Sequence, residues 1–295
     1  MNTGSVTHRI LLMVFAGAII TPFWVIFRQI NASDDVSSFR SSFPSVLIML
    51  DTTKDAYHTK LATIRSTWMK RVQEKHSMHI ILVGGNDVED MSDVIPSKCA
   101  AAGQGTPCKR AEMLTEAASY LRSNPGRNLN WVLFIEDNTF LLPDNLQRLI
   151  SALGPRAAIE DRVWGVTGCG DAKCSGICGG GGFLTNRGTV LKVVDGRDTR
   201  SFESLRDEAL SYDKQCGHYA DLVMTRIFEE RRGITVSQYP GGTYVWTFAN
   251  GDRGLLSSLR STNPLPWLYD LSATGKFDYI QQKADELRSS KPYID

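Results

Sequence analysis

Apolar runs alternate with segments of helical periodicity through most of the chain. Four mainly apolar runs have the length of strands buried in a parallel sheet. They are residues 46–50, 79–83, 131–135 and 163–166. Elsewhere apolar residues recur at helical spacing. These segments are 52–68, 109–123, the residues after Pro143, and 220–228. The alternation predicts an α/β architecture with a mostly parallel sheet.

The strand predicted at 131–135 is followed directly by the polar cluster Glu136, Asp137, Asn138 and Thr139. Open α/β sheets bind ligands at the carboxyl ends of their strands. Carboxylate and amide oxygens are also ligands that hard divalent cations prefer. We therefore take this turn, called the acidic turn below, as the candidate functional site.

Residues 10–27 contain no charged side chain. At 1.5 Å per residue a helix of this length spans roughly 27 Å, close to the thickness of a bilayer core. A cleaved signal peptide is the alternative, but Trp24 and Phe27 near the distal end favour an uncleaved signal anchor. We expect a cytosolic tail at 1–9, and a stem at 28–44 that contains a glycosylation sequon at Asn31.

The overall charge is balanced, with 33 Lys plus Arg against 32 Asp plus Glu. This balance gives no electrostatic case for nucleic-acid binding. The 295 residues, 42% of them hydrophobic, are enough to bury a sizeable core, and we assign 45–295 to one domain.

All six cysteines follow the predicted membrane span, at positions 99, 108, 169, 174, 178 and 216. An even number beyond an anchor favours a disulfide framework in an oxidising lumen. Cys99 and Cys108 are close enough to close a short loop. Zinc binding by Cys169, Cys174 and Cys178 is the alternative, although their spacing lacks the paired CxxC of common zinc sites.

Two further features are candidates for a site. The glycine run 179–182 allows close approach to a ligand or simply a flexible turn, and it matches neither a P-loop nor a GxGxxG motif. Asp221 stands at the start of the helix predicted at 220–228. A carboxylate there either caps the helix or takes part in chemistry.

Five stretches, in this order, resemble motifs of glycosyltransferase family 31, in its Fringe and core-1 galactosyltransferase group. They cover about residues 45–240 of the chain. They are Arg65-Ser-Thr-Trp68, Cys99 through Cys108-Lys109, Glu136-Asp137-Asn138-Thr139, Gly179 through Phe183, and Ala220-Asp221.

The resemblance implies a GT-A fold, an α/β class, behind an N-terminal transmembrane helix. It also implies a single-pass type II protein of the Golgi or endoplasmic reticulum, with its catalytic domain in the lumen. Its reaction would be inverting transfer of a hexose or N-acetylhexosamine from a UDP-sugar to a hydroxyl of a glycan or glycoprotein acceptor, with a β-1,3 linkage expected.

Site roles follow by position from the same resemblance. Asp221 would be the general base that takes the acceptor proton. Asp137 and Asn138 would hold Mn²⁺ or Mg²⁺ against the diphosphate. The donor-binding residues would be Arg65, Glu136, Asp137, Asn138, Gly180, Gly181 and Gly182.

The chain departs from the family pattern at three places. Asn138 replaces a family acid in the main metal position, and a neutral amide attracts a cation less strongly than a carboxylate. Ala220 replaces another acid, and residues 243–250 lack the histidine that family members bring to the metal. His218 lies in the wrong segment to replace it, and we interpret it as an ordinary surface or helix-entry residue.

Two hypotheses remain open from the sequence. In the first, the chain is a working transferase that binds metal weakly or uses basic residues instead. In the second, the same fold serves as a non-catalytic luminal chaperone or binding partner. Asp137, Asp221, the glycine run and Arg65-Ser-Thr-Trp68 favour the enzyme.

Overall fold

The computed structural model describes residues 44–75, 77–85, 92–99, 105–179, 182–194, 201–240, 245–247 and 268–270. All of them belong to the unit of the chain that begins at Pro44. The expected tail, the anchor at 10–27, nearly all of the stem and the Asn31 sequon lie outside these residues. Among the helices of the described part, none combines the length and the apolar character needed to cross a bilayer.

The centre of the fold is a seven-stranded sheet in the order β10-β6-β9-β4-β1-β2-β3. Strand β9 runs antiparallel to both of its neighbours, and every other neighbouring pair is parallel. The strands are β1 (Val46–Asp51), β2 (Met78–Val83), β3 (Val94–Ile95), β4 (Trp131–Glu136), β6 (Arg162–Gly165), β9 (Phe183–Asn186) and β10 (Thr235–Gln238). The predicted α/β class with a mainly parallel sheet is confirmed, and it fits the GT-A expectation.

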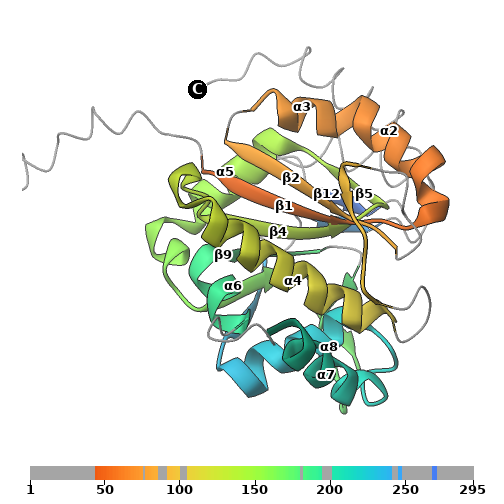
Figure 1. The fold of residues 1–295 in the computed structure, drawn as a ribbon. Helices are drawn as coiled ribbons and strands as arrows, with labels where there is room; N and C mark the ends of the chain where they lie inside the picture. The colour runs from red at the N-terminus through yellow and green to blue at the C-terminus, as the bar shows by residue number, and fades with distance from the viewer. Residues whose placement is uncertain are drawn as a thin grey trace, which may run out of the picture. The chain divides into compact units, whose positions relative to one another are not determined.

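Helices cover both faces of this sheet (Figure 1). One face carries α5 (Pro143–Leu153) and a continuous helical segment, 54–73. That segment comprises η2 (Lys54–Ala56), η3 (Tyr57–Leu61), α2 (Ala62–Ile64), η4 (Arg65–Met69) and α3 (Lys70–Gln73). The other face carries α4 (Gly105–Ser123), α6 (Arg187–Val194), α7 (Ser201–Asp213), α8 (Ala220–Arg226) and its continuation η8 (Ile227–Arg231). The turns η5 (Pro125–Arg127) and η6 (Pro155–Ala158) connect elements.

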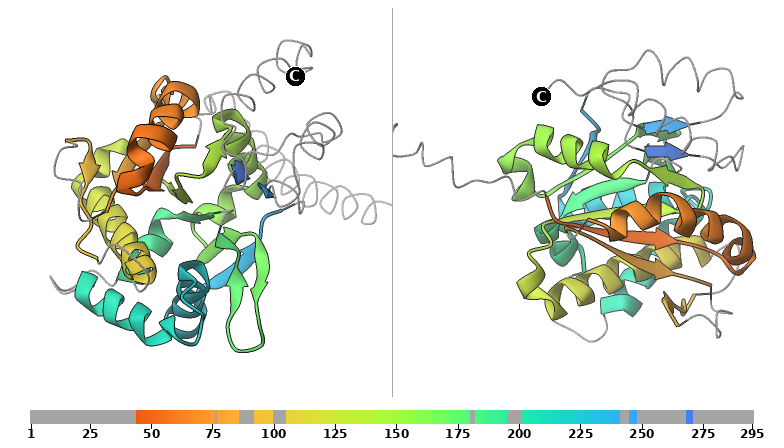
Figure 2. Two further views of the ribbon diagram at one scale, coloured as in Figure 1. Left: turned by 90° about the vertical axis from the view of Figure 1, so that its right-hand side faces the viewer. Right: turned by 90° about the horizontal axis from the view of Figure 1, so that it is seen from above.

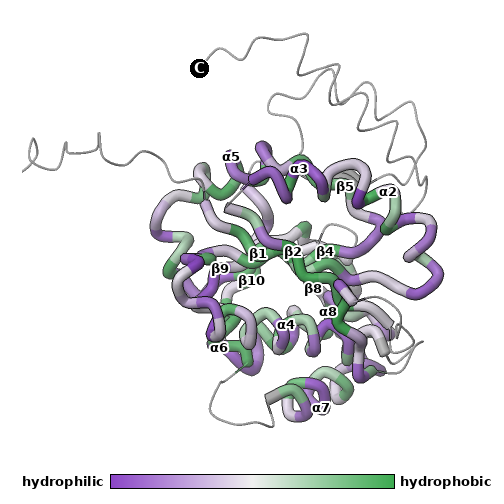
Figure 3. The backbone as a smooth tube through the Cα atoms, turned by 45° about the horizontal axis from the view of Figure 1, so that its top comes forward, coloured by the Kyte–Doolittle hydropathy of each residue, from purple (hydrophilic) through white to green (hydrophobic). Residues whose placement is uncertain are grey.

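The alternating direction of the side chains along β1 explains why helices cover both faces of the sheet. Val46, Ile48 and Leu50 join the core on one face, and Leu47 and Met49 join the core on the other. Because successive strand residues point to opposite faces, a fully apolar strand must be covered twice. Figure 3 shows the mainly hydrophobic strands β1, β2 and β4 between helices in which hydrophilic and hydrophobic residues are mixed.

The predicted helical faces are confirmed as packing surfaces. The apolar residues that recur at helical spacing in segment 52–68 are buried in the first core: Tyr57, Leu61, Ile64 and Trp68. Those of α4 are buried in the second: Ala111, Leu114, Ala117, Ala118 and Leu121. The helix expected from residue 52 begins only at Lys54. Thr52 therefore lies between β1 and the helical segment, where its side chain contacts the acidic turn.

Two small sheets flank the main one. Strand β5 (Thr139–Leu141) directly follows Asn138 and pairs antiparallel with β12 (Leu268–Asp270), which pairs parallel with β11 (Val245–Thr247). Figure 2 shows these short strands beside the main sheet. Strands β7 (Thr167–Gly170) and β8 (Ser175–Ile177) form a hairpin.

All six cysteines form disulfides: Cys99–Cys108, Cys169–Cys178 and Cys174–Cys216. The disulfide framework is confirmed, and the zinc alternative for Cys169, Cys174 and Cys178 is wrong because their thiolates are consumed in the cross-links. The hairpin β7–β8 is closed by Cys169–Cys178 and tied to the turn before α8 by Cys174–Cys216. The cross-links thus fix where α8 begins.

Candidate functional site

Asp137 lies buried at the carboxyl end of β4, with a relative exposure of 7%. Thr52 Oγ1 donates a hydrogen bond to its Oδ2 over 3.1 Å, and Lys60 Nζ lies 3.2 Å from its Oδ1. Thr52 follows β1, which pairs with β4 so that Asp51 lies opposite Glu136. The register of the two strands therefore places Thr52 beside Asp137, and Lys60 reaches the same carboxylate from η3 of the helical segment.

Arg110 joins two residues that the sequence analysis singled out separately. Its side chain is only 1% exposed, and its Nη2 lies 2.9 Å from Glu136 Oε1 and 3.4 Å from Asp221 Oδ1. Burial by itself lowers the pKa of Arg110, but the carboxylates of Asp221, Glu136 and Asp51 outweigh it, so the pKa is raised above its ordinary value. A fixed positive charge thus links the acidic turn to the start of α8.

The two carboxylate oxygens of Asp221 have different surroundings. Oδ1 is buried beside Arg110, whereas Oδ2 faces Gly179, where an added Cβ would stand only 2.7 Å from it. The N-cap residue Tyr219 makes no side-chain hydrogen bond to α8, and the Asp221 carboxylate lies against Arg110. The ion pair with Arg110 explains why this carboxylate can be buried, and its role as a base stays a prediction.

Helix α8 is fixed to the hairpin by Thr225. Its hydroxyl donates to the carbonyl oxygen of Asp221 over 2.8 Å and accepts a hydrogen bond from the Ile177 amide over 3.1 Å. An added Cβ on Gly176 would stand 2.4 Å from the Thr225 oxygen, so the hairpin packs closely on the helix. Together with Cys174–Cys216, these contacts hold Asp221 in place.

The glycine run is described only in part, because Gly180 and Gly181 lie outside the described residues. Gly182 has φ +57°, and an added Cβ would stand 2.3 Å from the carbonyl oxygen of Phe134 in β4. Both facts require glycine at this position. Packing against β4 explains Gly182, and its contact with a donor stays a prediction.

Arg65 does not contact the acidic turn in the structure. Its Nη2 lies 2.6 Å from Asp93 Oδ2, just before β3. Trp68, from the same motif, donates through Nε1 to the carbonyl oxygen of Thr139 over 3.1 Å. The motif therefore supports the acidic turn through Trp68, and the donor contact expected of Arg65 stays a prediction.

Three basic residues that the sequence pattern did not indicate also belong to the site: Lys60, Lys109 and Arg110. Lys109 Nζ lies 2.5 Å from Asp51 Oδ1 and also donates to the carbonyl oxygen of Thr52. Lys109 and Arg110 directly follow Cys108, whose disulfide ties the start of α4 to Cys99. Their position next to Cys108 was the feature of the sequence that could have identified Lys109 and Arg110. Lys60 lies in segment 52–68, where only the apolar residues were used for the prediction.

The predicted Mn²⁺ or Mg²⁺ on Asp137 and Asn138 can be compared with the donor groups. Both Asp137 oxygens already have partners, and one of them is an ammonium group. Asn138 turns its amide Nδ2 toward Glu136 Oε2, 3.4 Å away. Among the described residues no three His, Cys, Asp or Glu side chains come together to hold a metal ion. These residues do not fit a metal site, and the cofactor stays a prediction.

His218 is the histidine compared above with the metal-binding histidine that residues 243–250 lack. Its Nδ1 lies 2.7 Å from Oδ2 of Asp213, the last residue of α7. Residue 218 adopts φ 65°, which is uncommon for a residue other than glycine. The pairing agrees with a helix-entry histidine and gives it no part in the acidic turn.

A pocket of about 530 Å³ opens beside the start of α8. Tyr219 and Leu222, which flank Asp221 in the sequence, both line it. Tyr219 is 68% exposed, so its ring is accessible to a ligand. The remaining lining residues are Gly170, Asp171, Lys173, Cys174, Lys214, Gln215, Cys216 and Gly217.

No protein-family model matches the chain, and no curated protein matches it. Among solved structures it is similar to a glycosyltransferase involved in the glycosylation of the major capsid of PBCV-1, with 7% identity, a TM-score of 0.48, and coverage of 81% of this chain and 100% of that one. It is also similar to the glycosyltransferase GlyE of Streptococcus pneumoniae TIGR4, with 10% identity, a TM-score of 0.41, and coverage of 78% of this chain and 55% of that one. Both TM-scores lie below 0.5, so the function is argued from the side chains described above.

Proposed function

We propose that the chain is an inverting glycosyltransferase that moves a hexose or N-acetylhexosamine from a UDP-sugar to a hydroxyl of a glycan or glycoprotein acceptor. A β-1,3 linkage is the finer expectation from the family resemblance. The observation that carries the proposal is the ion-pair chain Glu136–Arg110–Asp221. It connects the acidic turn at the carboxyl edge of the sheet to a carboxylate suited to act as a base.

Asp221 is proposed as the general base. Arg110 holds Oδ1, which leaves Oδ2 on the Gly179 side to accept the acceptor proton. The acceptor oxygen forms a bond to the anomeric carbon of the donor, and the bond from that carbon to the diphosphate breaks. The electron pair leaves with the diphosphate, and a single displacement of this kind inverts the anomeric configuration.

The acceptor is proposed to approach over the pocket beside α8. Tyr219 offers an exposed aromatic face two residues before Asp221, and sugar rings pack their apolar faces on such rings. Lys173 and Lys214 in the pocket wall provide hydrogen-bond donors for acceptor oxygens. The acceptor and the acidic turn would then lie on either side of Asp221.

The cellular setting is part of the proposal. Three disulfides in the described residues fit an oxidising compartment, such as the lumen of the Golgi or endoplasmic reticulum. The apolar segment 10–27 would anchor the protein as a type II membrane protein. The domain from residue 45 onward would then face the lumen.

The test is release of UDP by the full chain, purified in detergent, from a panel of UDP-hexoses and UDP-N-acetylhexosamines. Each donor is offered with glycan and glycopeptide acceptors, with Mn²⁺ and with EDTA. Acceptor-dependent UDP release from at least one donor is the expected result. If no donor is turned over and UDP produces no thermal shift, the transferase is excluded and the non-catalytic partner takes its place.

A further inference from the structure

Among the described basic residues that contact the acidic turn or the adjacent strand end, Lys60 is the most accessible. Its side chain is 47% exposed, although its ammonium lies 3.2 Å from the nearly buried Asp137. Lys109 and Arg110 are 13% and 1% exposed. An anion that approaches the carboxyl edge of the sheet from solvent therefore finds Lys60 more accessible than the other two basic groups.

Lys60 already pairs with Asp137, the carboxylate on which a metal was expected to bind. Asp137 Oδ1 faces Lys60, and Oδ2 accepts a hydrogen bond from Thr52. A divalent cation on this carboxylate would have to displace the ammonium or lie against it, and like charges at such distances repel. Asn138, with a neutral amide, offers no charge that would offset the repulsion.

We propose that the Lys60 ammonium binds the diphosphate of the nucleotide donor in place of a divalent cation, so that donor binding does not require metal. This inference rests on the proposed transferase function and concerns the same site. An ammonium group has three N–H donors, so Lys60 can keep one bond to Asp137 and give two to phosphate oxygens. Asp137 and Thr52 would then orient the lysine.

The role of Lys60 in transfer is electrostatic. When the bond between the anomeric carbon and the diphosphate breaks, the electron pair stays on the diphosphate oxygen. The ammonium stabilises that negative charge by charge-assisted hydrogen bonds and keeps its own proton. The acceptor proton goes to Asp221, so the two residues act on different atoms.

The test measures UDP binding to the full chain by isothermal titration, in EDTA and in Mn²⁺. Wild-type protein is expected to bind UDP with equal affinity in both. Lys60→Ala is expected to weaken binding about tenfold to a hundredfold in EDTA, because a charge-assisted hydrogen bond is lost. Lys60→Arg, which keeps the charge, is expected to recover most of the affinity.

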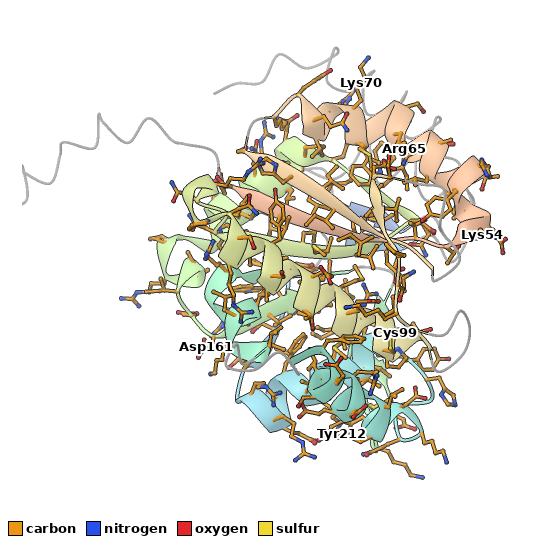
Figure 4. All side chains as sticks on the ribbon, viewed as in Figure 1. Lys54, Arg65, Lys70, Cys99, Asp161 and Tyr212 are labelled. Atoms are coloured by element: carbon orange, nitrogen blue, oxygen red, sulfur yellow. A yellow bond between two sulfur atoms is a disulfide. The ribbon has the colours of Figure 1, made fainter. Side chains whose placement is uncertain are left out.

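Lys70→Ala is the matched control. Lys70 is an exposed lysine of the same helical segment, near its other end and directed away from the sheet (Figure 4). Its removal changes the net charge by the same amount as Lys60→Ala. UDP affinity of Lys70→Ala is expected to equal that of the wild type, which separates a local contact from a general loss of positive charge.

Three results would overturn the inference, and they can be told apart. UDP binding that is lost in EDTA and restored by Mn²⁺ would assign the diphosphate to a metal and leave the transferase standing. Lys60→Ala with wild-type affinity would remove Lys60 and also leave the transferase standing. If UDP does not bind and no donor is turned over, the proposed function fails together with the inference.

Discussion

The turn that carries Glu136 and Asp137 and the helix that carries Asp221 are held in place by different means. The acidic turn follows β4, is paired through β1 and is supported by Trp68 from the covering helical segment. The start of α8 belongs to no strand of the main sheet and is held by Thr225 and the Cys174–Cys216 disulfide. Strand register thus positions one half of the site, the acidic turn. The Thr225 hydrogen bond and the disulfide position the other half, the start of α8.

The comparison shows how a site can be assembled from parts of unequal rigidity. A buried strand is fixed by many backbone hydrogen bonds, so its end needs little further support. A loop-to-helix junction has few such bonds and depends on individual contacts. Within the described part of the chain, Arg110 contacts both halves, so its removal should have the largest effect.

Arg110→Met should break the connection. It leaves Asp221 buried without its positive partner, and we expect a loss of about 3–5 kcal/mol in the free energy of unfolding, measured by urea denaturation. Arg110→Lys keeps a charge and should lose less. A loss below about 1 kcal/mol in Arg110→Met would show that the two halves do not depend on this residue.

The disulfides allow the two halves to be disturbed separately. Replacing Cys174 and Cys216 by serine should cost about 2–4 kcal/mol of stability and lower kcat, because the start of α8 is released, while UDP affinity is retained. Replacing Cys99 and Cys108 by serine should instead weaken UDP binding, because it releases the start of α4 beside Lys109 and Arg110. Titration and steady-state kinetics on both variants measure this. If both variants changed kcat and UDP affinity in the same way, the two halves of the site would not be held in place separately.

Gly179→Ala should disturb the base alone. The added methyl group would stand 2.7 Å from Asp221 Oδ2, so the carboxylate must move. We expect kcat to fall about tenfold with UDP affinity unchanged, since a small displacement of a reacting group costs rate rather than binding. Gly126→Ala is the control, because an added Cβ there meets no atom within 4 Å. An unchanged kcat in Gly179→Ala would place the reacting oxygen elsewhere.

Periodicity predicted the half of the site that the sheet positions. The apolar run at 131–135 became β4, and the acidic turn follows it as expected. The pattern did not predict β9 or β10, which are short, and it placed the strand Arg162–Gly165 one residue late. Strand β9 is fully buried inside the sheet, but its four residues include the polar Thr185 and Asn186, and the edge strand β10 contains one apolar residue among four, so neither forms an apolar run.

The partners of the acidic residues were not predicted from the sequence. Lys60 contacts Asp137 from one face of the sheet, and Lys109 contacts Asp51 from the other. The two residues of each pair are far apart in the sequence, so the sequence did not indicate either contact. The disulfide Cys174–Cys216 closes over 42 residues, so its pairing was left open. Such contacts depend on how helices cover the sheet, which periodicity alone does not determine.

The most direct test of the central claim compares kcat for sugar transfer in Asp221→Asn with that in Asp213→Asn, at saturating donor and acceptor. Both aspartates are buried, but Asp213 pairs with His218 and has no proposed part in the reaction. Loss of a general base predicts a fall of about 10²–10⁴-fold in Asp221→Asn, with UDP still bound, and little change in Asp213→Asn. An Asp221→Asn variant that transfers sugar at the wild-type rate would contradict the account.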